Sequence, residues 1–453
     1  MRLRRILFVF SIVLYTNLLT GCGSGSSVEG LYTAVTADGV DIKIRRYRPD
    51  PTHNYNNTQP IVLFPGILLN INEFLSHTPK GQKFNYRKMD LPNDLAEWAI
   101  GDEYIEDDPM VYYNLSHYLW TQGYDVWLAN YRGIGRGDFE SEKGNTRTNL
   151  DVWAALDTPA VINKVKQITG KKPVIGGHST GGLVSYLYLQ GVTMDPVPVR
   201  KGDYIPHLES SAALAVQRNA GVAGFLGIDP AGSPTLAYES LIDNGIIWTV
   251  LAQRWYFDLD YMVGEIIMPL LPPALTSSTV SLIFNTVSNL SDAFPAWLLP
   301  DTMDLFGAVN FWQTDQMNRY TSDYVGRMSL SSLYLRSLSQ YADWGINGTF
   351  REHWMNGEEN KGRINPPDAM DNDGYYRFNE NMSRMTVPAL SIFSDSSGLV
   401  DTDTMVEILY NGKTYHHNDD WIEIEGSGHV DITTNENAPT ILFPTIGEWL
   451  DNL

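Results

Sequence analysis

At 453 residues, the chain is long enough to form one large domain with an insertion, or two domains. Its 53 acidic and 32 basic residues give a formal net charge of −21, which argues against nucleic acid or an anionic lipid surface as a partner. The 12 tryptophans and 25 tyrosines suit an apolar binding surface as well as a large core.

The first 21 residues have the pattern of a secretory signal peptide. Arg2, Arg4 and Arg5 form a basic start, and residues 6–19 are an apolar run too short to span a membrane. Removal of residues 1–21 takes away three arginines and no acid, which changes the net charge from −21 to −24. Because Cys22 is the only cysteine in the sequence, the mature chain is expected to contain no intrachain disulfide.

The segment Leu19-Thr20-Gly21-Cys22 resembles the lipobox of bacterial lipoproteins, in which the cysteine is lipidated and becomes the new N-terminus. The resemblance implies a lipid anchor at Cys22 in a bacterial cell envelope, and Gly23 in place of Asp implies sorting to the outer membrane. Several acyl chains are expected on Cys22, because a single chain binds a membrane only marginally. Residues 22–30 would then be a flexible tether. An ordinary signal peptide cleaved elsewhere is the alternative.

Apolar runs without strict alternation, separated by helical patterns, predict a mostly parallel α/β sheet. In chain order, we expect a hairpin at 31–37 and 40–47, a strand at 60–66, a helix at 112–121, a strand at 123–130, a helix at 151–169, a strand at 173–176, a helix at 181–190, strands at 223–230 and 387–393, a helix at 402–409, a strand at 420–424 and a helix at 444–453.

Three segments depart from this pattern. Residues 70–110 are expected to be a polar excursion at the edge of the sheet, and residues 192–220 to be irregular. Residues 231–385 contain long amphipathic stretches with many aromatic residues, and we interpret them as an inserted helical cap. The cap would divide the core into a first part at 31–230 and a second part at 386–453.

The pentapeptide Gly177-His178-Ser179-Thr180-Gly181 fits G-x-S-x-G, the nucleophile elbow between a strand and a helix. The glycines allow the strand and the helix to approach closely around a strained turn. The pattern predicts that Ser179 is the nucleophile and that the backbone N–H of Thr180 is aimed where an oxyanion would form. The pentapeptide arises by chance in long chains, so the prediction depends on finding its partners.

A serine hydroxyl needs a general base, because it is a poor nucleophile at neutral pH. His429 is the best placed of the nine histidines, since it follows the last expected strand on a glycine-containing loop. His178 lies too close to Ser179 along the chain to act as its base, and His416 and His417 lie on a polar turn.

The third member of the triad has three candidates. An acid usually follows the strand at 387–393, but the usual position falls on Ser397, between Asp395 and Asp401. Asp229 ends the preceding strand, where a carboxylate can reach the same imidazole. Asp229 is preferred, and Asp395 and Asp401 stay open as alternatives.

The second oxyanion donor is expected from the turn Pro65-Gly66-Ile67-Leu68, with the N–H of Ile67 as the donor. The turn at residues 132–137 is rich in glycine but lacks the features of a phosphate-binding loop. The acidic loop at residues 368–373 lacks the spacing of a calcium loop. We therefore predict neither a cofactor nor a metal.

Four stretches together resemble the acid lipase branch, the gastric and lysosomal lipases, of the α/β-hydrolases: residues 61–68, residues 123–130 with Arg132-Gly133 behind them, residues 177–181, and His429-Val430-Asp431. The resemblance implies an α/β-hydrolase fold with Ser179 as nucleophile, His429 as base, and the amides of Ile67 and Thr180 as the oxyanion hole. That family's acid falls on Ser397 or Gly398 and does not carry over, whereas Gly227-Ile228-Asp229-Pro230-Ala231 is similar to the acid-bearing stretch of pancreatic-type lipases.

The sequence therefore predicts a membrane-anchored serine ester hydrolase, a lipase or carboxylesterase, that acts on lipid-like or other apolar esters. A polyester depolymerase or an acyltransferase of the same fold is the alternative among enzymes. From a different class, the chain could be a non-catalytic lipoprotein that uses the pocket for binding. The oligomeric state is not predicted.

Overall fold

The computed structural model describes residues 29–55, 57–79, 86–194, 208–232, 255–258, 316–348, 350–353 and 376–453. The expected signal peptide, Cys22, most of the expected cap and the acidic loop at 368–373 lie outside these ranges. The first strand begins at Glu29, so the last two residues of the expected tether belong to the sheet.

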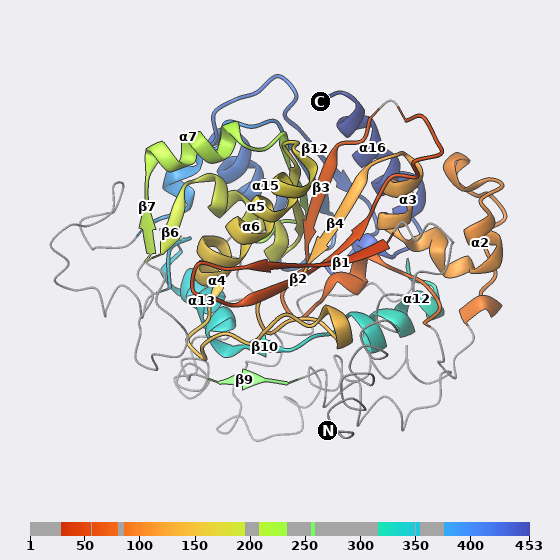
Figure 1. Cartoon of the computed structure of the whole chain (residues 1–453), viewed down its shortest axis with the longest axis horizontal. Coiled ribbons are helices and arrows are strands. Elements are labelled where there is room, and N and C mark those ends of the chain that lie inside the picture. Colours follow the sequence, from red (N-terminus) through yellow and green to blue (C-terminus); the bar gives the residue numbers. More distant parts are fainter. Residues whose placement is uncertain are drawn as a thin grey trace, which may run out of the picture.

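An eight-stranded sheet forms the centre of the molecule, in the order β1-β2-β4-β3-β5-β8-β11-β12 (Figure 1). β2 pairs antiparallel with β1 and β4, and all other neighbours are parallel, which confirms the predicted mostly parallel sheet. The strands are β1 (Glu29–Val35), β2 (Asp41–Tyr47), β3 (Pro60–Phe64), β4 (Asp125–Ala129), β5 (Val174–His178), β8 (Gly224–Ile228), β11 (Ala389–Ser394) and β12 (Asp420–Ile424).

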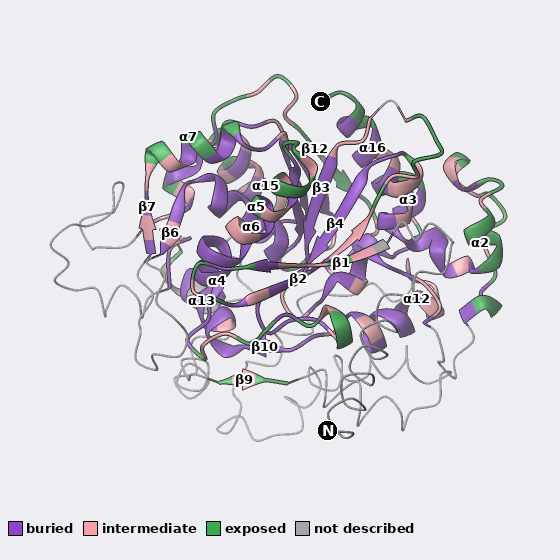
Figure 2. Ribbon diagram, in the orientation of Figure 1, coloured by how far each residue is buried: buried purple, intermediate pink, exposed green. Residues whose placement is uncertain are grey.

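The central strands are covered on both faces, as continuous apolar runs require. Every residue of β3, β4, β5, β8 and β11 is buried, as the purple colour of β3 and β4 in Figure 2 illustrates. β12, at the edge, is largely exposed. The site-bearing ends of β5, β8 and β11 therefore lie in a fully buried part of the sheet.

The helices form a layer on each face of the sheet. α5 (Thr158–Thr169) and α6 (Thr180–Leu189) pack into one core cluster, and α3 (Leu115–Thr121) and α16 (Phe443–Asp451) pack into the other. α5 continues from α4 (Leu150–Val152) and η6 (Trp153–Asp157), and it ends at Gly170, whose φ of 68° is left-handed. α15 (Thr402–Val406) and η12 (Glu407–Asn411) fill the position of the helix predicted at 402–409.

The prediction of irregular structure at 192–220 is wrong where the structure describes the segment. β6 (Val192–Met194) pairs antiparallel with β7 (Leu208–Ser210), and α7 (Ala212–Ala220) follows with Ser211 as its N-cap. Strands of three residues are too short to show an alternating pattern, and their pairing depends on a partner distant in sequence.

Where the structure describes it, the polar excursion at 70–110 forms short helical turns, which contribute to a third core cluster that includes Tyr86, Met110 and Tyr324. These turns are η1 (Ile71–Phe74), η2 (Tyr86–Lys88), η3 (Glu97–Ala99), α2 (Glu103–Asp107) and η4 (Pro109–Tyr113). Elsewhere the short turns are η5 (Gly137–Phe139), η11 (Asn379–Arg384), η13 (Asp431–Thr433) and η14 (Ala438–Leu442).

The expected cap lies between β8 and β11, and the structure describes only parts of it. These include α12 (Arg319–Tyr324), η10 (Val325–Ser329) and α13 (Leu335–Asn347). They also include a small antiparallel ribbon of β9 (Tyr256–Phe257) and β10 (Leu333–Tyr334). Within the described residues, no helix combines the length and the apolar character that crossing a membrane would need.

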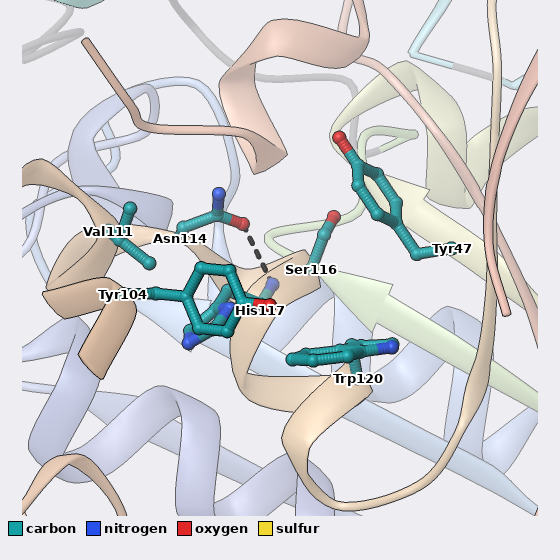
Figure 3. A pocket seen from close by; sticks show the side chains of 7 residues that line it. All are labelled: Tyr47, Tyr104, Val111, Asn114, Ser116, His117 and Trp120. Atoms are coloured by element: carbon teal, nitrogen blue, oxygen red, sulfur yellow. Dashed lines mark hydrogen bonds between the residues drawn. The ribbon is translucent and has the colours of Figure 1, made fainter. Parts of the chain in front are cut away.

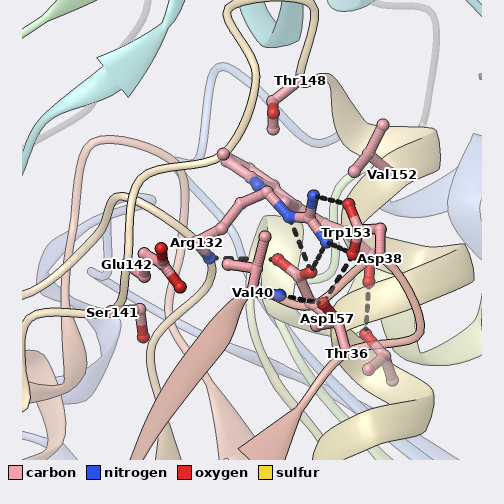
Figure 4. A network of polar contacts seen from close by, with 12 residues as sticks. Thr36, Asp38, Val40, Arg132, Ser141, Glu142, Thr148, Val152, Trp153 and Asp157 are labelled. Atoms are coloured by element: carbon pink, nitrogen blue, oxygen red, sulfur yellow. Dashed lines mark hydrogen bonds and ion pairs between the residues drawn. The ribbon is translucent and has the colours of Figure 1, made fainter. Parts of the chain in front are cut away.

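Arg132 follows β4, in the glycine-rich turn, and the residue is 1% exposed. It donates to both carboxylate oxygens of Asp38, at 2.6 and 3.0 Å, and to Asp157 at 2.6 and 2.8 Å (Figure 4). The guanidinium therefore lies between two carboxylates, of which Asp157 is fully buried and Asp38 is half-buried. The arginine links the β1–β2 turn to the start of α5, which is a structural role for this turn.

Candidate active site

Ser179 stands between β5 and α6, at φ 52° and ψ −117°, a strained conformation for a residue with a Cβ atom. A Cβ atom added to Gly177 or Gly181 would lie 2.0 Å from the carbonyl oxygen of Phe64 in β3. Only glycine fits at both positions, so the pentapeptide forms the strand–turn–helix that its pattern predicts. The N–H of Ser179 donates to the carbonyl of Ile228 at 2.9 Å, which ties the elbow to the end of β8.

His429 lies on the loop after β12, and its two ring nitrogens contact two different candidate residues. Nε2 is 2.8 Å from Oγ of Ser179, and Nδ1 is 2.6 Å from Oδ2 of Asp229. Because a carboxylate only accepts, Nδ1 donates to Asp229 and Nε2 is left to accept the hydroxyl proton of Ser179. Burial lowers the pKa of His429 below its usual value, against the opposing effect of Asp229. The imidazole is thus neutral and available as a base at neutral pH.

Asp229 is fully buried and directly follows β8. Its φ of 42° is left-handed, a region that Asp tolerates better than most residues do. Besides His429, the carboxylate accepts the N–H of Ser394 at 3.1 Å and the hydroxyl of Ser397 at 2.7 Å. These two donors hold the carboxylate in place against the imidazole.

The two alternative acids lie elsewhere. Asp395 is exposed, and its Oδ1 accepts the N–H of Ser427 at 3.2 Å. Asp401 is exposed, and it caps α15 by accepting the N–H of Thr404 at 2.8 Å. Of the three predicted carboxylates, the structure places Asp229 against His429.

Ile67 and Thr180 carry the two predicted oxyanion donors, and the turn of Ile67 reaches Ser179 at Gly66, where an added Cβ atom would lie 3.3 Å from Cβ of Ser179. Ile67 lies on the turn after β3, next to Leu68 at φ 64°, and Thr180 is the first residue of α6. Within the described part of the chain, neither backbone N–H has a hydrogen-bond partner. Both N–H groups are therefore free to donate to a substrate, as the donors of an oxyanion hole must be.

The expected cap supports both of these amides. Oγ1 of Thr180 lies 2.6 Å from the hydroxyl of Tyr341 in α13. The turn after β3 is held by backbone hydrogen bonds, from Ser331 N–H to Leu68 O at 2.7 Å and from Asn70 N–H to Ser329 O at 2.8 Å.

Two residues near the site escaped the sequence prediction. Ser397 occupies the position where this fold usually has its acid, and its hydroxyl donates to the Asp229 carboxylate. The serine at that position was therefore a signal in the sequence that the acid comes from another strand. Glu73 is buried beside His178, with Nδ1 and Oε2 2.7 Å apart. It lies in the excursion at 70–110, where no sequence pattern singled it out.

A separate cavity of about 170 Å³ lies between the end of β2 and the helices α2 and α3 (Figure 3). It is lined by Tyr47, Tyr104, Val111, Asn114, Ser116, His117 and Trp120, none of which is a candidate catalytic residue. Among the described residues, no group of three or more His, Cys, Asp or Glu side chains is arranged to hold a metal ion.

Residues 60–200 match the family model described as the alpha/beta hydrolase fold. No curated protein matches the sequence. Among solved structures, the chain is similar to a membrane phospholipase A described as a bacterial virulence factor, at 12% identity and a TM-score of 0.40, over 100% of this chain and 99% of that one. It is also similar to a thermophilic esterase from Thermogutta terrifontis, at 12% identity and a TM-score of 0.42, over 93% of this chain and 98% of that one. A putative aryl esterase from Burkholderia cenocepacia matches at 14% identity and a TM-score of 0.41, over 93% of this chain and 98% of that one.

Proposed function

We propose that this chain, which has the α/β-hydrolase fold, is a serine ester hydrolase with the triad Ser179, His429 and Asp229. One observation carries the proposal: a single buried imidazole lies 2.8 Å from the serine at the elbow and 2.6 Å from a buried carboxylate. A nucleophile, a base and a group that orients the base, each within hydrogen-bond distance of the next, are the parts that acyl transfer needs.

In the proposed reaction, Oγ of Ser179 attacks the ester carbonyl while Nε2 of His429 takes the hydroxyl proton. The N–H groups of Ile67 and Thr180 donate to the oxyanion, and each such donor typically stabilises the transition state by about 3 kcal/mol. His429 returns the proton to the departing alcohol, which leaves an acyl ester on Ser179. Water, deprotonated by His429, then releases the carboxylic acid and restores the serine.

The proposed substrates are lipid-like carboxylic esters with an apolar acyl group, as the resemblance to acid lipases implies. Support comes from the aromatic residues of the expected cap, among which Trp255 and Phe257 have 51% and 36% of their surfaces exposed. Exposed aromatic side chains provide an apolar surface that an apolar ligand can contact.

The lipid anchor at Cys22 and the placement in a bacterial cell envelope are also proposals. They are supported by the lipobox-like segment alone, and Cys22 lies outside the described residues. Replacement of Cys22 with alanine, followed by cell fractionation, tests them; protein that stays in the membrane fraction would refute the anchor.

Covalent labelling tests the proposed function directly. A fluorophosphonate is expected to form one adduct on Ser179, located by mass spectrometry of the digested protein. Purified protein should also release p-nitrophenol from p-nitrophenyl esters in water. The same assay with an added alcohol separates hydrolysis from acyl transfer, because a transferase would yield the new ester in place of the free acid. An unlabelled Ser179 would favour a binding protein.

The pH dependence of ester hydrolysis follows from the lowered pKa of His429. The base must be neutral, so activity is present above this pKa and is lost as the pH falls through it. We expect the acidic limb of the profile of kcat/KM against pH to lie below about 6.5, the usual imidazole value. A half-maximal rate above pH 7 would contradict this assignment of the base.

A further inference from the structure

Behind Ser179, a glutamate and a histidine that the proposed reaction does not use form a buried pair. Oε2 of Glu73 lies 2.7 Å from Nδ1 of His178, and the two residues are 2% and 0% exposed. Glu73 comes from η1, and His178 is the last residue of β5, directly before the nucleophile. Burial of an unpaired charge is costly. Two buried titratable groups next to the nucleophile therefore indicate a specific structural or functional role.

The outer atoms of the pair make two further hydrogen bonds. Oε1 of Glu73 accepts the N–H of Gly66 at 2.9 Å, in the turn that carries the proposed oxyanion donor Ile67. Nε2 of His178 lies 2.7 Å from the backbone carbonyl oxygen of His429. A continuous chain of hydrogen bonds therefore runs from the oxyanion turn to the backbone of the proposed base.

The partners of the two side chains fix where the protons lie. A carbonyl oxygen only accepts, so Nε2 of His178 must carry a proton. The second proton lies between Nδ1 and Glu73, and the pair has no net charge whichever of the two holds it. Burial raises the pKa of Glu73. Burial alone would lower the pKa of His178, but the Glu73 carboxylate raises it above its usual value. Both shifts keep this proton in the pair.

We propose that Glu73 and His178 are positioning residues that hold the oxyanion turn and the His429 loop in register on either side of Ser179. This inference rests on the proposed function of Ser179 and His429. The contacts are close: a Cβ atom on Gly66 would lie 3.0 Å from Nδ1 of His178 and 3.3 Å from Cβ of Ser179. The turn therefore packs directly on the His178 ring, and a shift of that ring would move the turn.

The register matters because the reacting groups must be aligned at the same moment. The proton acceptor lies on the loop after β12 and the Ile67 N–H on the turn after β3, two segments that approach each other at the elbow. Misplacement of a catalytic group by about 1 Å can reduce the rate about 10²-fold. A neutral pair suits this place, because it adds little repulsion when His429 takes up its proton in the transition state.

Three substitutions of Glu73 separate hydrogen-bond geometry from charge. Glu73→Gln can accept from Gly66 and donate to Nδ1 of His178, so it preserves the chain of hydrogen bonds without the charge. Glu73→Leu fills similar space and makes neither bond. Glu73→Asp keeps the charge and shortens the side chain by one methylene group. We expect kcat within about threefold of wild type for Gln, about 10-fold lower for Asp and about 10²-fold lower for Leu, with KM within about threefold throughout.

The order of the three variants decides the outcome. If Glu73→Leu does not fold, as judged by near-ultraviolet circular dichroism, the comparison of Gln with Asp decides alone. A wild-type kcat in Glu73→Leu, or a higher kcat in Glu73→Asp than in Glu73→Gln, would overturn the inference.

Ser179→Ala, assayed with the same ester, distinguishes a failure of this inference from a failure of the proposed function. If it is inactive while Glu73→Leu is fully active, only the positioning role fails. If the wild type hydrolyses no ester, the proposed function fails, and the rate of fluorophosphonate labelling of Ser179 provides the same comparison among the Glu73 variants.

Discussion

Replacement of Ser179 with alanine is expected to lower kcat for ester hydrolysis by roughly 10⁶-fold, the size of effect found when a serine hydrolase loses its nucleophile. Alanine keeps the Cβ atom, so the φ of 52° adds no new steric strain at this position. The contact between His429 and Asp229 does not involve the hydroxyl and should persist. The loss would therefore report the missing nucleophile and not a rearranged site.

Steady-state hydrolysis of a p-nitrophenyl ester measures this effect. Ser185→Ala is the matched control, because Ser185 lies on the same helix, is fully buried, and donates only to the carbonyl of Gly181 at 2.8 Å. Its kcat should stay near the wild-type value. The double variant Ser179→Ala, His429→Ala should be no slower than Ser179→Ala, since the two residues act as a unit. Hydrolysis that survives in Ser179→Ala would refute the proposed nucleophile.

The elements that position the site could be predicted because each has a local signature. Strands β3, β4 and β5 are largely apolar runs in which every residue is buried, and β3 is followed directly by a Pro-Gly turn. The G-x-S-x-G pattern predicts its own turn, since a Cβ atom on Gly177 would overlap Phe64 O. By contrast, β6 and β7 are three residues long and are stabilised by pairing with each other, so no local sequence pattern predicted them.

The partners of Ser179 show where local reasoning ends. His429 could be chosen from its place after the last strand, but the sequence left Asp395 and Asp401 open as alternatives to Asp229. Glu73 could not be predicted at all, because its importance comes from a histidine 105 positions later in the sequence. Burial and partner identity are tertiary properties, and these separated the three carboxylates.

Replacement of Asp229 with asparagine is expected to lower kcat by about 10⁴-fold. The Asn amide can place an N–H opposite Nδ1, which favours the imidazole tautomer with its proton on Nε2, where it cannot accept from Ser179. Asp395→Asn and Asp401→Asn are the matched controls. Asn retains the Oδ1 atom that accepts from Ser427 in one case and from Thr404 in the other, so both variants should keep wild-type kcat.

Ser397 allows a test of whether the acid can be moved. Its Oγ lies 3.4 Å from Nδ1 of His429 and 2.7 Å from Asp229, so a carboxylate introduced at this position can reach the imidazole. Ser397→Asp in the Asp229→Asn background should recover about 10²-fold of the lost kcat, because it restores an acceptor for the Nδ1 proton. Ser397→Ala in the same background should recover nothing. In the wild-type background, Ser397→Asp places two buried carboxylates side by side, and the like charges raise the pKa of one of the two carboxyl groups. That variant should be slower than wild type.

If Asp229→Asn retains full activity, or if Asp395→Asn or Asp401→Asn shows the large loss instead, Asp229 is not the acid that orients His429.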